Sequence, residues 1–116
     1  MSNTLAQQHC QPCAIGTRPL LADEINRLLP SIGRWKKLQV DTVDRIQRDY
    51  HFQDFREAFA FATKVAALAE RENHHPSLTV EWGIVRVCWW THKINGLHIN
   101  DFIMAAKTDA LMTRAD

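Results

Sequence analysis

Histidines and carboxylates gather in the second half of the sequence. Four of the six histidines lie between positions 74 and 98. Histidine is the side chain whose ordinary pKa allows proton exchange near neutral pH. A cluster of histidines therefore suits acid–base chemistry, in which one group donates a proton and another accepts it. The candidate residues are Glu70, His74, His75, His92 and Asp101.

Two other interpretations of these residues compete with catalysis. Histidines in the last turn of a helix often bond the free carbonyl groups there, and an aspartate in a first turn is an ordinary capping residue. A metal site is disfavoured because the adjacent His74 and His75 would point about 100° apart on a helix. No cysteine or second carboxylate accompanies them at a recognised ligand spacing. A purely structural role therefore stays open beside the catalytic one.

The hydrophobic pattern predicts the elements that must position these side chains. We expect helices at 22–29, 54–73 and 99–113, and strands at 35–40, 45–52, 77–82 and 84–91. Pro76 prevents the long helix from continuing, and Gly83 supplies the turn of the second hairpin. This order, α-β-β-α-β-β-α, predicts a single α+β domain, a four-stranded antiparallel sheet with three helices on one face. The candidate side chains then come from the ends of elements at one rim of the sheet.

The long helix carries more apolar surface than one packing face requires. Its stripe consists of Phe55, Ala58, Phe59, Ala62, Val65, Ala66 and Ala69. Phe61 and Leu68 lie beside that stripe, so we expect a second face that meets another element or another subunit. The edge strands of the sheet are also open to pairing. Both features predict at least a dimer, with the helix and a sheet edge as alternative contact surfaces.

Length and composition limit the possible functions. The 116 residues leave room for one domain, which we place at 19–116 after a flexible arm at 1–18. The net charge of +1 argues against nucleic acid as a direct partner. We expect no membrane span and no signal peptide, because neither pattern is present. Three cysteines, an odd number, argue against a disulfide framework and favour the cytoplasm.

The arm contains a second candidate motif, His9-Cys10-x-x-Cys13. It could be half of a zinc site or a redox pair. A single Cys-x-x-Cys without a partner pair is a weak signal, and no strand–helix unit of the thioredoxin kind follows it. We therefore predict no metal site, and the role of the two cysteines stays open.

The spacing of the candidate residues resembles a known family. The run Glu70-x-x-x-His74-His75-Pro76 matches the signature of the pterin-4a-carbinolamine dehydratases. The spacing from this run to the next fixed positions of the signature also agrees, and those positions are Trp82, His92 and Asp101. Further similar segments are Leu28-Leu29-Pro30, Gly33-Arg34-Trp35, Phe52-x-Asp54-Phe55 and Gly96-Leu97. The similarity covers about residues 20–112, which is nearly the whole predicted domain.

The resemblance implies an enzyme, a hydro-lyase of the bacterial 4a-hydroxytetrahydrobiopterin dehydratase type. Members of the family remove water from the 4a-hydroxytetrahydropterin that aromatic amino-acid hydroxylases release, and they form quinonoid dihydropterin without a metal or organic cofactor. They thereby recycle the tetrahydrobiopterin cofactor of phenylalanine hydroxylation. Carried over by position, His74, His75 and His92 line the pterin site. His75 and His92 are then the acid–base groups, and His74 binds and orients the substrate near the 4a hydroxyl.

The resemblance also implies supporting residues. Glu70, one helical turn before His74, could orient an imidazole and fix its tautomer. Asp101 could serve His92 in the same way, and we expect Trp35 to pack against the flat pterin. At Trp82 the family accepts any large aromatic residue, so a core anchor for the hairpin and a substrate contact both stay open. Of the adjacent Trp89 and Trp90, one is expected in the core and the other beside the site.

A regulatory function is the alternative that the resemblance allows. Vertebrate relatives also act as dimerisation partners of a homeodomain transcription factor, and some related bacterial proteins affect expression of a neighbouring hydroxylase. A pterin-binding chaperone in molybdopterin metabolism is a third class. The presence of all three histidines favours activity, because a scaffold has no need of them. Family members are homodimers or homotetramers, and a functional link to an aromatic amino-acid hydroxylase is expected here too.

Overall fold

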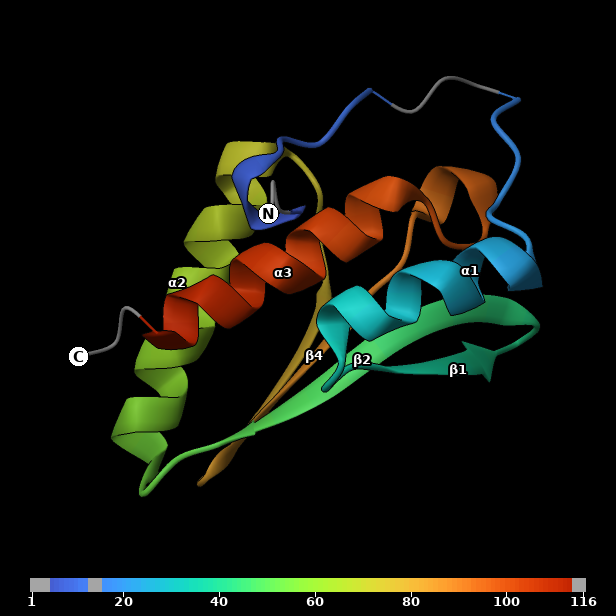
Figure 1. Cartoon of the computed structure of the whole chain (residues 1–116). Helices are drawn as coiled ribbons and strands as arrows, with labels where there is room; N and C mark the ends of the chain where they lie inside the picture. Colours follow the sequence, from blue (N-terminus) through green and yellow to red (C-terminus); the bar gives the residue numbers. More distant parts are fainter. Residues whose placement is uncertain (1–4, 13–15, 114–116) are drawn as a thin grey trace.

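The computed structural model describes residues 5–12 and 16–113 of the chain (Figure 1). Its elements are α1 (Ala22–Leu28), β1 (Lys36–Val40), β2 (Val43–His51), α2 (Phe55–Glu72), β3 (Ser77–Glu81), β4 (Ile84–Trp89) and α3 (Ile99–Thr113). Short 3-10 helices complete the list: η1 (Leu5–Gln7), η2 (Leu29–Ile32) and η3 (His92–Ile94). The predicted α+β class and the predicted order of helices and strands are confirmed.

The four strands form one antiparallel sheet in the order β1-β2-β4-β3. Asp41 and Thr42 both have positive φ and form the two-residue turn between β1 and β2. The central strands carry buried side chains that alternate along each strand and face the helices: Ile46, Tyr50, Val85, Val87 and Trp89. All three helices cover this one face (Figure 1), as predicted.

The turn between β3 and β4 requires glycine because of a close backbone contact. A Cβ on Gly83 would lie 3.1 Å from the carbonyl oxygen of Phe52, and the Phe52 N–H donates to the Gly83 carbonyl at 2.8 Å. Beside it, the side chain of Trp82 is 73% exposed. The interpretation of Trp82 as a core anchor is therefore wrong, because most of its side chain is in contact with solvent.

The phase of α2 differs from the prediction. Its buried residues are Ala58, Phe61, Ala62, Val65, Leu68 and Ala69. Phe61 is 3% exposed and packs on Tyr50 with ring centroids 4.6 Å apart, whereas Phe55 and Phe59 are 51% and 56% exposed. The aromatic residues at 55, 59 and 61 lie on two faces of the helix, so periodicity allowed two choices. Packing buries Phe61 and Leu68 together with four residues of the predicted stripe, so the core face is shifted from that stripe, and Phe55 and Phe59 are left outside it.

The helix α3 lies across the middle of the helical layer, between α1 and α2 (Figure 1). Four consecutive residues, Phe102, Ile103, Met104 and Ala105, are fully buried. A helix buried on all sides can carry a polar residue only where that residue is hydrogen-bonded. The two polar side chains that α3 buries completely, Asp101 and Thr108, both have such partners.

No helix in residues 5–12 and 16–113 is long and apolar enough to cross a membrane. The boundary that we place between residues 18 and 19 stays a prediction.

Candidate active site

A cleft of about 480 Å³ lies where α2, β4 and α3 approach one another at the rim of the sheet. It is lined by Cys10, Gln11, Pro12, Glu72, Asn73, His74, His75, Thr91, His92, Lys93 and Asn100. The structure thus brings His74, His75 and His92 to one cavity, although up to 18 positions separate them in the sequence.

The two adjacent histidines follow α2 rather than end it. Asn73 adopts the left-handed conformation at φ 54°, and the His74 N–H donates to the Ala69 carbonyl at 3.1 Å. This arrangement ends a helix and turns the chain sharply. The side chain of His74 consequently points inward and is 12% exposed, while that of His75 is 54% exposed. The two rings therefore occupy different environments despite being neighbours in sequence.

His74 is held by a fully buried carboxylate. Oδ1 of Asp101 lies 2.6 Å from Nε2 of His74, and its Oδ2 accepts from the Thr91 hydroxyl at 2.8 Å and from the His98 N–H at 3.0 Å. Because an ionised carboxylate only accepts, this pairing assigns the proton of the neutral ring to Nε2 and leaves Nδ1 as an acceptor. Among the described residues, Nδ1 of His74 has no hydrogen-bond partner.

The predicted partner of Asp101 was wrong. Asp101 pairs with His74 and not with His92, because the turn at Asn73 directs His74 toward the start of α3. The Trp89 ring then stacks on His74 at 5.7 Å with an interplanar angle of 12°. Trp89 is fully buried, so it is the core member of the tryptophan pair.

Glu70 pairs with His75, at 2.6 Å between Oε2 and Nε2, so the imidazole that it contacts is that of His75. Its side chain is 78% exposed, and that of His75 is half exposed. Water competes strongly for such groups, so this pair contributes far less orientation than the buried one.

His92 is positioned by packing on an aromatic ring. It opens η3 within a loop that Thr91 and Gly96 close through backbone hydrogen bonds. Its ring lies 4.4 Å from the ring of the half-buried Trp90, whose other contact is the Arg45 guanidinium at 3.8 Å from the ring centroid. Trp90 therefore borders the site, and His92 stays exposed.

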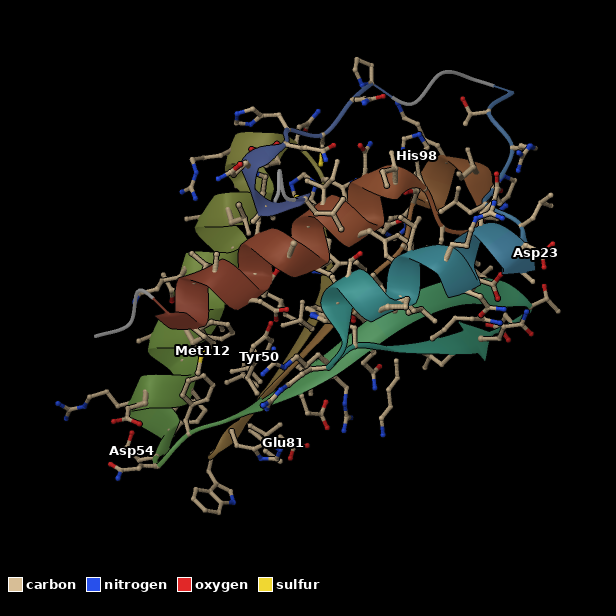
Figure 2. The ribbon with its side chains drawn as sticks, in the orientation of Figure 1. Asp23, Tyr50, Asp54, Glu81, His98 and Met112 are labelled. Atoms are coloured by element: carbon tan, nitrogen blue, oxygen red, sulfur yellow. The ribbon has the colours of Figure 1, made fainter. Side chains whose placement is uncertain are left out.

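Trp35 lies away from this cleft. It is 4% exposed, and its Nε1 donates to Asp109, which also accepts from Arg48 at 2.6 Å and from the Tyr50 hydroxyl. Figure 2 places Tyr50 near the middle of the sheet and His98 at the far end, where α3 begins. A second hollow of about 650 Å³ lies over β1 and β2 and is lined mainly by basic and polar residues, without Trp35. The structure thus gives Trp35 a core role instead of the predicted contact with the pterin.

Several residues of the cleft were not predicted from the sequence. Thr91 and Asn100 are neighbours of predicted site residues, so their position was a usable signal. Cys10, Gln11 and Pro12 belong to an arm without periodicity, which offered none. Among the described residues, no group of three or more histidine, cysteine, aspartate or glutamate side chains could hold a metal ion. Cys13 of the Cys-x-x-Cys motif lies outside the described residues.

Fold and site together define a class of small α+β proteins, in which three helices cover one antiparallel sheet and a histidine-lined cleft opens at its rim. Residues 18–111 match the family model described as pterin 4 alpha carbinolamine dehydratase. Proteins of Syntrophotalea carbinolica and Microcystis aeruginosa, both provisionally named pterin-4-alpha-carbinolamine dehydratases, are each 50% identical to the chain. These matches cover 93% and 90% of this chain, and 96% and 90% of the relatives. The chain belongs to the pterin-4-alpha-carbinolamine dehydratase family.

Two solved structures are similar to this one. A protein of Brucella melitensis described as a transcriptional coactivator/pterin dehydratase is 35% identical, with a TM-score of 0.73 over 81% of this chain and 98% of its own. A pterin dehydratase-like protein described as a RuBisCO assembly factor of the alpha-carboxysome is 20% identical, with a TM-score of 0.56 over 66% of this chain and 87% of its own. This second likeness is one of fold alone.

Proposed function

We propose that this protein dehydrates pterin-4a-carbinolamine to quinonoid dihydropterin, with His74, His75 and His92 as the working residues. The observation that carries the proposal is the convergence of these three side chains on one cleft, with one of them locked by a buried carboxylate. The family membership and the names of the 50% identical relatives support it.

The reaction needs two proton transfers and no redox step. The bond between carbon 4a and the hydroxyl oxygen breaks, and the departing oxygen takes a proton and leaves as water. The ring nitrogen beside carbon 4a loses its proton, and the electron pair released forms the carbon–nitrogen double bond. One acid and one base are sufficient, and each contributes about 10²–10⁴-fold to the rate.

The three histidines divide these tasks by their environments. The exposed His75 and His92 exchange protons with water, which suits the acid and the base. In the neutral ring of His74, Nδ1 accepts a hydrogen bond, and the 4a hydroxyl of the substrate offers a donor of the right kind. His74 therefore binds and orients the substrate, with Asp101 as its positioning residue.

The natural role of the activity is the recycling of the tetrahydrobiopterin cofactor for an aromatic amino-acid hydroxylase. We place it in the cytoplasm and without a metal or organic cofactor, since proton transfer alone is required. The two described cysteines, Cys10 and Cys88, are both free, in keeping with a reducing compartment.

A second candidate function concerns assembly. Phe55 and Phe59 are more than half exposed on α2, and their rings stack at 5.9 Å. Two adjacent exposed aromatic rings favour a protein contact. We propose that this pair joins copies of the chain in a homodimer or homotetramer. A regulatory partner is the alternative, since the relative from Brucella melitensis is described as a transcriptional coactivator.

The decisive experiment measures dehydration of carbinolamine generated by a hydroxylase, above the uncatalysed background. The wild type should accelerate the reaction, and His75→Ala or His92→Ala should each lower the rate by about 10²–10³-fold. Both variants should stay folded, because both side chains are exposed. A wild type that leaves the background rate unchanged would disprove the activity, and near-normal rates in both variants would disprove the assignment of residues.

A further inference from the structure

The N-terminal arm is tied to the rim of the histidine cleft by specific hydrogen bonds. Asn100, which is 2% exposed, accepts from the Gln11 N–H at 2.9 Å through Oδ1 and donates to the Gln11 carbonyl at 2.7 Å through Nδ2. The side-chain amide thus binds the backbone of one arm residue at both of its polar groups. Asn100 immediately precedes Asp101, so the same turn of α3 holds the arm and positions His74.

A carboxylate of α2 provides the second attachment. Glu72 accepts from the Cys10 N–H at 3.0 Å and pairs with Nδ1 of His9 at 2.9 Å. Burial would raise the pKa of Glu72, but the Cys10 N–H, His9 and Lys107 together outweigh it and lower the pKa, so the group is ionised at neutral pH. Lys107 also donates to the Ala6 carbonyl at 3.0 Å. The arm is therefore attached at several points along residues 6–11.

The attached segment forms part of the cleft itself. Cys10, Gln11 and Pro12 line the same 480 Å³ as the three histidines, together with Glu72 and Asn100 that hold them. The backbone of Gln11 is occupied by Asn100, whereas its side chain is exposed. Among the described residues, the Gln11 carboxamide has no hydrogen-bond partner. A residue that lines the cleft thus carries a donor and an acceptor that no described residue occupies.

We propose that Gln11 is a substrate-binding residue, and that the segment 10–12 recognises the pyrimidinone edge of the pterin. This inference rests on the function proposed above. A carboxamide offers one donor and one acceptor side by side, which complements the amide-like N–H and carbonyl of that edge. The edge adjoins carbon 4a, so a pterin held there keeps its reacting carbon beside the histidines. Asn100 and Glu72 act as positioning residues for this segment.

Kinetics of Gln11→Ala test the proposal, with Gln7→Ala as the matched control on the exposed surface of η1. Loss of one hydrogen bond to the bound ring should raise KM about 3- to 10-fold and leave kcat within about twofold. Asn100→Ala should raise KM by a similar factor, because it removes the hydrogen bonds that hold the backbone of Gln11 at the cleft. Gln7→Ala should match the wild type. An unchanged KM in Gln11→Ala, or an equal rise in Gln7→Ala, would overturn the assignment.

Two substrates that differ only at carbon 6, one with a methyl group and one with a dihydroxypropyl group, show which part of the pterin Gln11 binds. The KM of Gln11→Ala should rise by the same factor for both, because their rings are identical. A rise confined to the dihydroxypropyl substrate would refute recognition of the ring edge.

Binding of 7,8-dihydrobiopterin, followed by fluorescence quenching, separates this inference from the proposed activity. If the wild type has no dehydratase activity but binds the probe, and Gln11→Ala binds it more weakly, the proposed activity is refuted and the role of Gln11 in pterin binding is supported. Equal affinity of the wild type and Gln11→Ala for the probe would refute the role of Gln11 in pterin binding, even if the enzyme is active.

Discussion

Asp101→Asn should change the tautomer of His74 and slow the reaction while the fold persists. In the native protein Oδ1 of Asp101 faces Nε2 of His74, and Oδ2 accepts from Thr91 and from the His98 N–H. An asparagine that keeps its oxygen at the Oδ2 position keeps the latter two bonds and places an NH₂ group against Nε2. Nε2 must then accept, so the ring proton moves to Nδ1.

The magnitude follows from one hydrogen bond. Nδ1 would present a donor in place of an acceptor, so the 4a hydroxyl could accept from it but its own proton would lose its acceptor, which costs about 1.4–2.8 kcal/mol. This corresponds to a kcat/KM about 10- to 100-fold lower. The charge-assisted bond to His74 is also replaced by a neutral hydrogen bond in a fully buried place, so the free energy of unfolding should fall by about 0.5–1.5 kcal/mol.

Asp109→Asn is the matched control. Asp109 lies on the same helix and, like Asp101, has three hydrogen-bonding partners, here the side chains of Trp35, Arg48 and Tyr50, but it is not part of the cleft. Its side chain is 30% exposed, so the loss of stability should be smaller. The kcat/KM of Asp109→Asn should stay within about twofold of the wild type, because none of the three partners of Asp109 packs on a ring of the cleft.

Steady-state kinetics, thermal unfolding and ¹⁵N NMR of the His74 ring measure the three expected effects of Asp101→Asn. If the tautomer of His74 switches in Asp101→Asn and kcat/KM is unchanged, Nδ1 of His74 does not bind the substrate in the way that we propose. Equal losses of activity in Asp101→Asn and Asp109→Asn would reduce the role of Asp101 to stability.

Three further predictions follow from other contacts. Glu70→Gln should lower kcat/KM by less than about threefold, because its pair with His75 is exposed to water; a loss as large as that of Asp101→Asn would contradict this. Phe59→Glu should reduce the mass measured by light scattering to that of a smaller assembly, whereas Ala60→Glu, with the same added charge on another exposed part of α2, should not; a monomeric wild type would refute the contact. Burial, with the charges of Glu72 and Asp101, raises the pKa of Cys10 to about 12, so the thiol stays protonated well above pH 9. Iodoacetamide at pH 8 should therefore alkylate Cys10 at least about 10²-fold more slowly in the native protein than in urea, as mass spectrometry of the Cys10 peptide measures, and equal rates would contradict the raised pKa of this partly buried thiol.

The order of the elements was predictable from the sequence because it depends on local patterns. The span of α3 at 99–113 agrees with the prediction, since its apolar residues recur with helical spacing. Strand ends shifted by a residue or two, as at β4, which ends at Trp89 instead of Thr91. The family signature also named the three histidines of the cleft, because their spacing along the chain is itself a local property.

The face of α2 that enters the core was decided only by tertiary packing. Phe55, Phe59 and Phe61 are equally apolar, and a phase shift of the helix exchanges which of them is buried. Phe61 packs on the rings of Tyr50 and Phe52, with ring centroids 4.6 and 5.3 Å away. Burying a phenylalanine contributes about 1.5–3 kcal/mol, so this contact selects the phase. Phe61 therefore belongs to the core and not to a contact with another subunit, and Phe61→Glu would place a charge in the core.

The chemistry of the site likewise depended on the tertiary structure. The sequence contained two carboxylates and three histidines, but the pairing of Asp101 with His74 requires the left-handed turn at Asn73 and the buried start of α3. The arm was predicted to be loose because it has no periodicity, and its attachment to Glu72 and Asn100 consists of hydrogen bonds between residues 62 to 90 positions apart. Local spacing determines which residues are present near a rim, whereas long-range contacts determine which of their atoms face one another.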